Sequence, residues 1–412
     1  MGKIWRGKSF LVTVIILVLI TSSFVFAQEN SKSEDDVLEL SLKEALEIAE
    51  ENNQQVKISE LGLEKAKLAK KQYRYQDKKA KDMEDAIKEA IEQWNQLPEE
   101  MQRELEEEGL KPVDPGLSSS FEYTYQMDIL EKTTDIGVKL AEAGIDVTVK
   151  GIHFGVEAAY YGALSAKENT MIAEAALERQ KDMLKIAQAQ YNVGTVAKKD
   201  VLDAEVQLAS AEANLLKAQV QEEKAYINLK RLLGLPLDKP IKLTDYFEYN
   251  PKDLEKNLEE IIEEAQQSRI DIMSAEGTFE IAKLDFDLNS KVYPSNTFIY
   301  KEKEHAMEEA RMKLADTRSS VEAEVRGIWL DLKEAETNIF VLDKSLEMAE
   351  ESLRIAKLSY EAGLIRSVDV AAAEEGFKQV QLQRSAVIYN YNLARLKLEN
   401  VVYFSVSGSL TV

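Results

Sequence analysis

The chain has 412 residues, of which 45% are hydrophobic and 31% charged, and it carries a formal net charge of -22 with no cysteine. The acidic balance excludes nucleic acid as an expected partner, because a phosphate backbone would be repelled. The absence of cysteine from the sequence excludes a disulfide framework and a thiolate metal site. With only seven prolines and 17 glycines, the composition favours long helices over a compact mixed fold.

The N-terminus has the features of a secretory signal peptide. Cationic residues precede an apolar run over residues 10–20, and a small-residue site ending at Ala27 follows it. The run is shorter than the ~20 residues that a membrane-spanning helix needs. We therefore expect residues 1–27 to be a cleaved signal peptide and the protein to be exported.

Two halves of the chain are related to each other. Residues 156–233 align with residues 325–402 at a constant offset of 169, without a gap. The paired positions include Tyr191 and Tyr360, Gly194 and Gly363, and Asp200 and Asp369. Internal similarity over this length indicates a tandem structural repeat.

The start of each half follows a different offset. Residues 42–68 align with residues 258–284 at an offset of 216, so the first half holds about 47 additional residues. We predict a first structural repeat over residues 28–252, with a helical insertion at about 77–123, and a second repeat over residues 253–412.

Each repeat is predicted to contain a long helical hairpin. Roughly 40 helix-forming residues lead up to the glycine and a similar number lead away from it, which corresponds to arms of ~60 Å. Gly194 and Gly363 suit the left-handed C-cap of the first helix, and Asp200 and Asp369 suit the N-cap of the second. The hairpin tip should lie between glycine and aspartate, and the first return arm should stop at residues 233–236.

Two apolar rows lie along the first return arm. The first row contains Val201, Ala204, Leu208, Ala211, Leu215 and Ala218. The second row contains Val206, Ala209, Ala213, Leu216 and Val220. The rows are roughly 140° apart at ~100° per residue, so the helix needs a neighbour on each flank. A wall of helices that closes into a cylinder meets this need, and a solid helical bundle is the alternative.

Each repeat contains two characteristic segments. The first repeat contains "LSLKEALEIAEENNQQVKISELGLEKAKLA" and "YNVGTVAKKDVLDAEVQLASAEANLLKAQVQEEKAYINLKRLLGLP". The second contains "LEEIIEEAQQSRIDIMSAEGTFEIAKLDF" and "YEAGLIRSVDVAAAEEGFKQVQLQRSAVIYNYNLARLKLE". In this order, the four segments resemble the TolC family of outer-membrane export ducts.

The resemblance implies a mostly α fold in which long antiparallel helical hairpins, in two tandem repeats, form a coiled-coil α-barrel as a homotrimer. It implies a passive conduit in a tripartite efflux or type I secretion system, located at the outer membrane and periplasm of the cell envelope. A periplasmic adaptor, also called a membrane fusion protein, and an inner-membrane pump would be its partners.

The family's tip residues can be carried over by position. Asp369 matches an aspartate that rings the constriction, while the family's next aspartate position is Ala372 here. Tyr360 and Asp200 match a closing contact between helices, and Arg366 lies one residue from the corresponding arginine. Helix capping is the alternative role for Asp200 and Asp369.

The sequence departs from the family where membrane strands are expected. The family has four β-strands per protomer in a shared barrel, and residues 288–301 are too few for the two strands and turn that belong there. Only residues 121–125 and 145–149 alternate as strands do. We therefore expect little or no β-barrel.

The sequence does not predict an enzyme. His153 and His305 are its only histidines, so no histidine pair has metal-binding spacing, and glycine-flanked nucleophilic serines do not occur. We expect no catalysis, no metal and no cofactor. The leading hypothesis is the export duct gated by its hairpin tips, and the alternative is an exported coiled-coil scaffold or spacer that conducts nothing.

Overall fold

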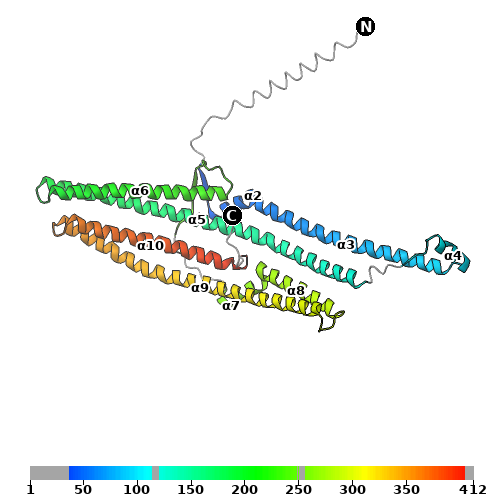
Figure 1. Cartoon of the computed structure of the whole chain (residues 1–412). Coiled ribbons are helices and arrows are strands. Elements are labelled where there is room, and N and C mark those ends of the chain that lie inside the picture. Colours follow the sequence, from blue (N-terminus) through cyan, green and yellow to red (C-terminus); the bar gives the residue numbers. More distant parts are fainter. Residues whose placement is uncertain (1–36, 114–119, 248, 250–255, 404–412) are drawn as a thin grey trace, which may run out of the picture. The chain divides into compact units, whose positions relative to one another are not determined.

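The computed structural model describes residues 37–113, 120–247, 249 and 256–403 (Figure 1). The predicted signal peptide, residues 1–27, lies outside the described residues. The chain divides into a small unit, Met1–Glu39 with Asp238–Lys242, and a large unit, Leu40–Leu237 with Leu243–Val412. The large unit holds the helices discussed below.

The described residues are mostly helical, which confirms the predicted mostly α fold with long helical hairpins. The helices are α2 (Leu42–Asn52), α3 (Gln54–Asn95), α4 (Glu99–Glu107), α5 (Phe121–Asn192), α6 (Lys198–Leu232), α7 (Leu258–Ser268), α8 (Ile270–Ser290), α9 (Phe298–Glu361) and α10 (Ser367–Glu399), with a 3-10 turn at Val401–Tyr403. Two short strands, β1 (Leu38–Leu40) and β2 (Ile241–Leu243), pair with each other. No helix in the described part of the chain is both long and apolar enough to cross a membrane.

Helix boundaries follow the two sequence offsets. α6 begins at Lys198 and α10 at Ser367, which is the offset of 169, and α2 and α7 begin at Leu42 and Leu258, which is the offset of 216. Polar residues set these starts, since Ser41 and Asn257 each accept a hydrogen bond from the third residue of the helix that follows. The repeats differ in length at α3, which has 42 residues where α8 has 21.

The two segments that alternate as strands do, residues 121–125 and 145–149, are helical in the structure. Both segments lie inside α5. Their alternation has another cause, because α5 packs against α3 on one side and α8 on another. The Tyr123 hydroxyl donates to Asp77 on α3 at 3.3 Å, and the Tyr125 hydroxyl donates to Asp285 on α8 at 2.8 Å.

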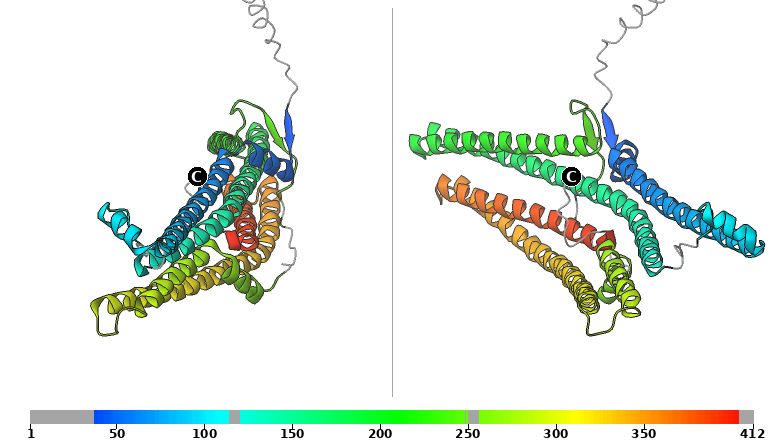
Figure 2. Two further views of the ribbon diagram at one scale, coloured as in Figure 1. Left: turned by 90° about the vertical axis from the view of Figure 1, so that its right-hand side faces the viewer. Right: turned by 45° about the vertical axis from the view of Figure 1, so that its right-hand side comes forward.

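Four long helices lie side by side in the order α6, α5, α10, α9 (Figures 1 and 2). α5 packs along α6, α9 along α10, and α5 also packs on α10. The first apolar row of α6 faces this packing, since Ala204 and Ala211 are buried. The second row is exposed in the single chain, with Val206 65% and Leu216 62% exposed. α6 and α9 are therefore the edge helices of a four-helix layer.

The first return arm ends where the sequence predicted. α6 stops at Leu232, and Gly234 has a φ of 66° while the Leu235 amide donates to the Lys230 carbonyl at 3.0 Å. This is a glycine-terminated helix end, because glycine adopts a positive φ without a steric penalty. The prediction of a stop at residues 233–236 is confirmed.

A buried arginine fixes the corner between α7 and α8. Arg269 is fully buried, and its guanidinium lies 2.8 Å from a carboxylate oxygen of Asp271 and 2.8 Å from one of Glu324 on α9. Burying a cation costs free energy unless the cation is paired, and the two carboxylates offset this cost for the Arg269 guanidinium. The contact ties the corner to α9.

A carboxyl group on α5 has an unusual environment near α10. Burial and, to a smaller extent, the nearby Glu399 carboxylate raise the pKa of Glu157 to about 7, and Lys150 opposes the shift. The pKa of Glu157 is higher in the folded protein than in the unfolded chain. Its protonation therefore contributes fully to folding stability at pH values below the unfolded pKa, and this contribution is lost as the pH rises through about 7.

We predict that Glu157→Gln removes this pH dependence, because an amide stays neutral at every pH. Above pH 7 the variant should unfold with a free energy higher than wild type by about 2 kcal/mol, allowing for partial solvent screening. Thermal unfolding at several pH values between 5 and 8 measures this. Glu350→Gln, at an exposed position on α9, is the control. Identical pH slopes for wild type and Glu157→Gln would contradict the assignment.

Candidate functional site

The two hairpin turns have the same backbone geometry. Gly194 and Gly363 have φ angles of 79° and 75°, in the left-handed region that suits glycine. In the first turn, the Thr195 amide donates to the Gln190 carbonyl at 2.9 Å. In the second, the Leu364 amide donates to the Ser359 carbonyl at 2.8 Å. These six-to-one hydrogen bonds end α5 and α9 in Schellman motifs.

The aspartates after the turns cap the return helices from a different position than predicted. Asp200 and Asp369 are not N-cap residues but the third residues of α6 and α10, whose N-caps are Ala197 and Arg366. Each carboxylate accepts a hydrogen bond from its N-cap backbone amide at 3.0 Å. Carboxylates are favoured in the first helical turn because amide groups there lack partners and the helix dipole is positive.

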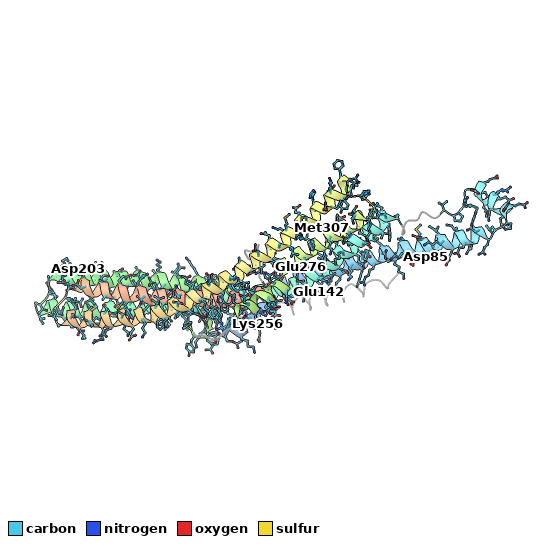
Figure 3. All side chains as sticks on the ribbon, turned by 90° about the horizontal axis from the view of Figure 1, so that it is seen from below. Asp85, Glu142, Asp203, Lys256, Glu276 and Met307 are labelled. Atoms are coloured by element: carbon cyan, nitrogen blue, oxygen red, sulfur yellow. The ribbon has the colours of Figure 1, made fainter. Side chains whose placement is uncertain are left out.

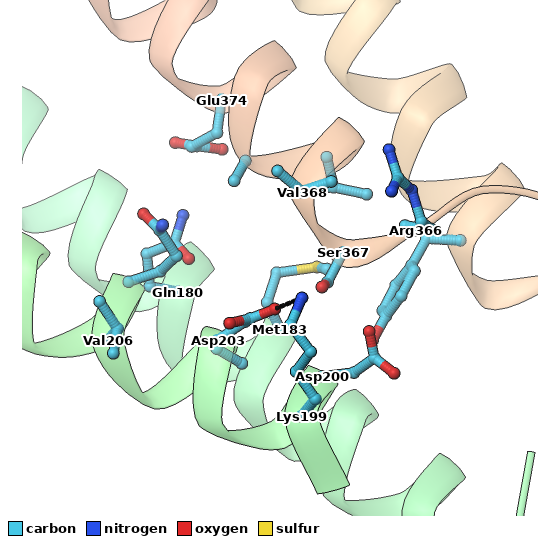
Figure 4. A pocket seen from close by; sticks show the side chains of 15 residues that line it. Gln180, Met183, Lys199, Asp200, Asp203, Val206, Arg366, Ser367, Val368 and Glu374 are labelled. Carbon is cyan, nitrogen blue, oxygen red and sulfur yellow. Dashed lines mark ion pairs between the residues drawn. The ribbon is translucent and has the colours of Figure 1, made fainter. Parts of the chain in front are cut away.

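A cavity of about 460 Å³ lies between the two hairpin tips (Figure 4). Asp200, Tyr360 and Arg366 all line it, so the structure brings three of the four predicted side chains to one place. Asp369 is not among the lining residues, and its carboxylate lies 3.7 Å from Nε of Arg366 in its own turn. Arg366 is thus engaged locally and its side chain is 78% exposed.

Tyr360 is the buried centre of the tip region. It is 2% exposed, whereas its repeat counterpart Tyr191 is 44% exposed. Its ring packs in a cluster with Met183, Phe377 and other apolar side chains. Burial raises the pKa of the Tyr360 hydroxyl, and the charge of Asp200 raises it further. Among the described residues no hydrogen-bond partner reaches this buried hydroxyl.

Gln190 joins the first hairpin to the second. Its side-chain amide donates to the backbone carbonyl of Tyr360 at 3.3 Å. Sequence reasoning missed this residue, because the repeat alignment pairs it with Ser359 and glutamine is common on solvated helix surfaces. The contact depends on the packing of α5 against the other hairpin.

A buried ion pair connects the hairpins farther from the tips. Nε of Arg179 on α5 lies 2.5 Å from a carboxylate oxygen of Glu374 on α10, and Glu374 is 5% exposed. The guanidinium also lies over the ring of Phe377, 5.3 Å from its centroid. Burial lowers the pKa of the nearby Lys357 amine, and the Glu374 charge opposes that shift.

The sequence analysis also missed this ion pair. The sequence does contain a feature that could have predicted the role of Glu374. This residue lies between Val370 and Phe377 at heptad spacing, in a row that is otherwise apolar near the tip. A charge in such a row needs a buried partner. Arg179 gives no comparable signal, since its repeat counterpart is Met348 and many charged residues lie on the same helix.

The cavity has both acidic and basic lining groups. Lys199 pairs with Asp203 at 3.3 Å on the α6 side (Figure 4). In the described part of the chain no cluster of histidine, aspartate or glutamate is arranged to hold a metal ion. The arrangement therefore offers contacts that hold two hairpins together, and it offers neither a nucleophile with a base nor a metal centre.

Comparison with known proteins identifies the same architecture. Residues 139–235 match the model of the family described as "Outer membrane efflux protein". The fold is similar to the Campylobacter jejuni CmeC outer membrane channel, with 15% identity and a TM-score of 0.62 over 89% of this chain and 87% of the other. A membrane protein from Pseudomonas aeruginosa also aligns, with 15% identity and a TM-score of 0.62 over 88% and 93%.

A third structure, the Vibrio cholerae outer membrane protein VceC, aligns with 17% identity and a TM-score of 0.57 over 69% of this chain and 77% of the other. No curated protein sequence matches significantly. The family match and the shared fold confirm the resemblance to TolC-type channels that the sequence indicated.

We predict that Glu374→Gln lowers the free energy of unfolding by about 2–4 kcal/mol, because it leaves the Arg179 guanidinium largely buried without its counter-charge. Chemical denaturation followed by circular dichroism measures the change. Replacing both residues by leucine should recover most of the loss, since no charge is then left unpaired.

Glu375→Gln is the matched control for this substitution. Glu375 is the next residue, its side chain is 64% exposed, and it pairs with Lys378 on the surface. Its variant should keep near wild-type stability. Equal effects of the two glutamine substitutions would show that the Arg179 contact contributes nothing.

Proposed function

We propose that three copies of the chain form a helical tunnel that serves as a passive export or efflux duct, opened and closed by its hairpin tips. The family match and the fold shared with outer-membrane channels support a duct. The observation that carries the proposal is the exposed apolar row on each edge helix of the four-helix layer.

The exposed row on α6 is its second heptad row. Val206, Leu216 and Val220 are 65%, 62% and 44% exposed. A matching row on α9 contains Val341, Met348 and Ile355 at a spacing of seven, and these side chains are 54%, 71% and 52% exposed. Contiguous apolar rows on an exported protein mark surfaces that other protein surfaces cover.

One arrangement covers both rows. The α6 edge of one copy packs against the α9 edge of the next, which is a heterologous contact and closes into a ring. Each large apolar side chain that becomes fully buried contributes roughly 1.5–3 kcal/mol. The proposed number of three copies comes from the resemblance to TolC-type ducts. The ring leaves a bore, in contrast to the solid helical bundle.

The tips then act as the gate. Opening requires the second hairpin to move away from the first, which separates Gln190 from the Tyr360 carbonyl and Arg179 from Glu374. Asp369 faces the neighbouring copies at the constriction in this proposal. Ala372 occupies the family's next aspartate position, so the ring at the constriction has fewer acidic side chains than in the family. The remaining aspartates still favour cations over anions.

A passive duct needs partners that supply the energy for transport. We propose that a periplasmic adaptor joins the tip end to an inner-membrane pump, and that the duct works in the outer envelope. Drug efflux and type I protein secretion are the two systems in which such a duct would act. A scaffold that trimerises without a bore is the competing function.

Leu216→Glu should dissociate the assembly, because it places a charge in the centre of the covered α6 row. We expect light scattering to give a trimer mass for the wild type and at least roughly tenfold weaker association for the variant. Gln219→Glu adds the same charge at an exposed position outside the row and should leave the trimer intact. A wild-type monomer at micromolar concentration would reject the proposal.

A disulfide can test the edge pairing directly, because the chain has no cysteine of its own. Leu216 and Val341 each lie 22 residues from the glycine of their hairpin tip, Gly194 and Gly363. Oxidation of the Leu216→Cys/Val341→Cys variant should give a covalent ladder that ends at three chains on a denaturing gel. A ladder that ends at two chains would contradict the ring.

A three-dimensional electron-microscopy map of the same trimer separates duct from scaffold. A duct requires a continuous bore along the helices. A trimer whose centre is filled with side chains would overturn the transport function while leaving the helical fold intact.

A further inference from the structure

The cavity between the hairpin tips, which we call the tip cavity, is large enough to hold a small molecule. Its volume is about 460 Å³, and residues of α5, α6, α9 and α10 line it. Asp203, one of the lining residues, lies at the tip end of the long helices, away from Met307 on α9 (Figure 3). Ligand sites in proteins are typically concave spaces of ~300–1,000 Å³ with a few polar groups. The tip cavity has the size of such a site.

One part of the cavity wall is apolar. Met183 of α5, Val370 of α10 and Tyr360 of α9 line the cavity, and all three belong to one buried cluster. Val206 of α6 lines it as well. Side chains that pack in a cluster form a fixed surface, on which the hydrocarbon part of a ligand can be buried.

Most of the charged groups that line the tip cavity already have partners. Lys199 pairs with Asp203 at 3.3 Å, and Arg366 pairs with an aspartate of its own turn at 3.7 Å. Glu374 pairs with Arg179 at 2.5 Å. The two cationic lining residues are therefore neutralised locally, and so are two of the three acidic ones.

Asp200 is the exception among these charged groups. Its carboxylate accepts a hydrogen bond from the Ala197 backbone amide at 3.0 Å, and within the described ranges it forms no ion pair. The adjacent Lys199 pairs with Asp203 instead. The carboxylate of Asp200 thus lines the cavity without a counter-charge, and such a group attracts a cation.

The hydroxyl of Tyr360 lacks a partner in the same place. Tyr360 is 2% exposed, and among the residues that the structure describes none hydrogen-bonds its hydroxyl. Burial and, to a smaller extent, the charge of Asp200 raise the pKa of this hydroxyl, so the carboxylate acts on it electrostatically. Buried polar groups in folded proteins are rarely unpartnered, and a ligand is one way to satisfy them.

We propose that the tip cavity binds a small primary ammonium ion with an apolar body. The ammonium group supplies the counter-charge that Asp200 lacks and donates a hydrogen bond to the Tyr360 hydroxyl oxygen. A primary ammonium has three donors, so it can serve both acceptors at once. The apolar body packs against Met183 and Val370.

The bound ion contacts both hairpins in this proposal. Asp200 belongs to the first hairpin and Tyr360 to the second, so the complete site exists only while the hairpins adjoin. A ligand that binds one arrangement better than another shifts the population toward it. The ammonium ion therefore holds the tips together. This consequence for gating rests on the proposed function, whereas the binding itself does not.

The probe for this site is 2-phenylethylammonium, and 2-phenylethanol is its uncharged analogue of nearly the same shape. Isothermal titration calorimetry on the whole protein should give a dissociation constant of about 0.1–1 mM for the ammonium ion. The alcohol should bind at least roughly tenfold more weakly, because it carries no charge for Asp200.

Asp200→Asn and Asp369→Asn form a matched pair. Both aspartates are the third residues of their return helices and accept a hydrogen bond from the N-cap amide at 3.0 Å, but only Asp200 lines the cavity. Asparagine keeps an oxygen for this contact, so neither variant threatens the fold. Asp200→Asn should weaken ammonium binding about tenfold or more, and Asp369→Asn should leave it unchanged.

Tyr360→Phe removes the hydroxyl and keeps the ring. It should weaken ammonium binding several-fold and raise the thermal midpoint of the unliganded protein, because an unsatisfied buried group is removed. A tyrosine with a purely structural role would not produce this combination. Unchanged binding by the phenylalanine variant would contradict the assignment.

Three further outcomes would overturn the inference. They are no measurable binding of the ammonium ion up to about 10 mM, equal binding of the alcohol, and equal losses in Asp200→Asn and Asp369→Asn. Light scattering on the same samples keeps the two proposals apart. A monomer that binds the ammonium ion with the expected selectivity rejects the ring and retains the site.

Discussion

The structure depends on one constraint, which is that a helix with apolar residues on two flanks needs two neighbours. Within one chain α6 has α5 along its first row, and α9 has α10, while the outer row of each remains in water. The single chain is therefore a layer with an exposed apolar row on each of its two edge helices. The need for a second neighbour grows with the length of the helix, because a longer helix exposes the same apolar row over more turns. Closure of the layer on itself in a ring is the arrangement that leaves no edge.

Much of the fold could be predicted because local rules and the repeat agree. Gly194 and Gly363 occupy turns that require a positive φ, and the two offsets place the helix starts. The alternation at Tyr123 and Tyr125 did not distinguish a strand from a helix, because a helix with neighbours on two sides also alternates over five residues. At the site, Gln190 and Arg179 were not predictable, because their roles arise from the packing of one hairpin on the other.

The two ends of the long helices have different chemistry. Near the tips, polar contacts join the hairpins, and the Arg179–Glu374 pair is buried between them. Such a pair adds little net stability over an apolar pair of the same volume, but it penalises any register in which one charge loses its partner. At the other end, the Tyr300 ring of α9 packs against Phe286 of α8, and Phe298 is exposed.

The proposed ring of three chains has six similar hairpins, two from each chain. The unequal burial of Tyr191 and Tyr360 within one chain means that these hairpins are related by threefold and not sixfold symmetry. The tyrosine of the first hairpin is 44% exposed and that of the second is 2% exposed, although the repeat places them at equivalent positions. In the proposed ring, the hairpin that carries Tyr360 would lean on the first hairpin of its own chain, so the two kinds of hairpin would not be equivalent at the gate.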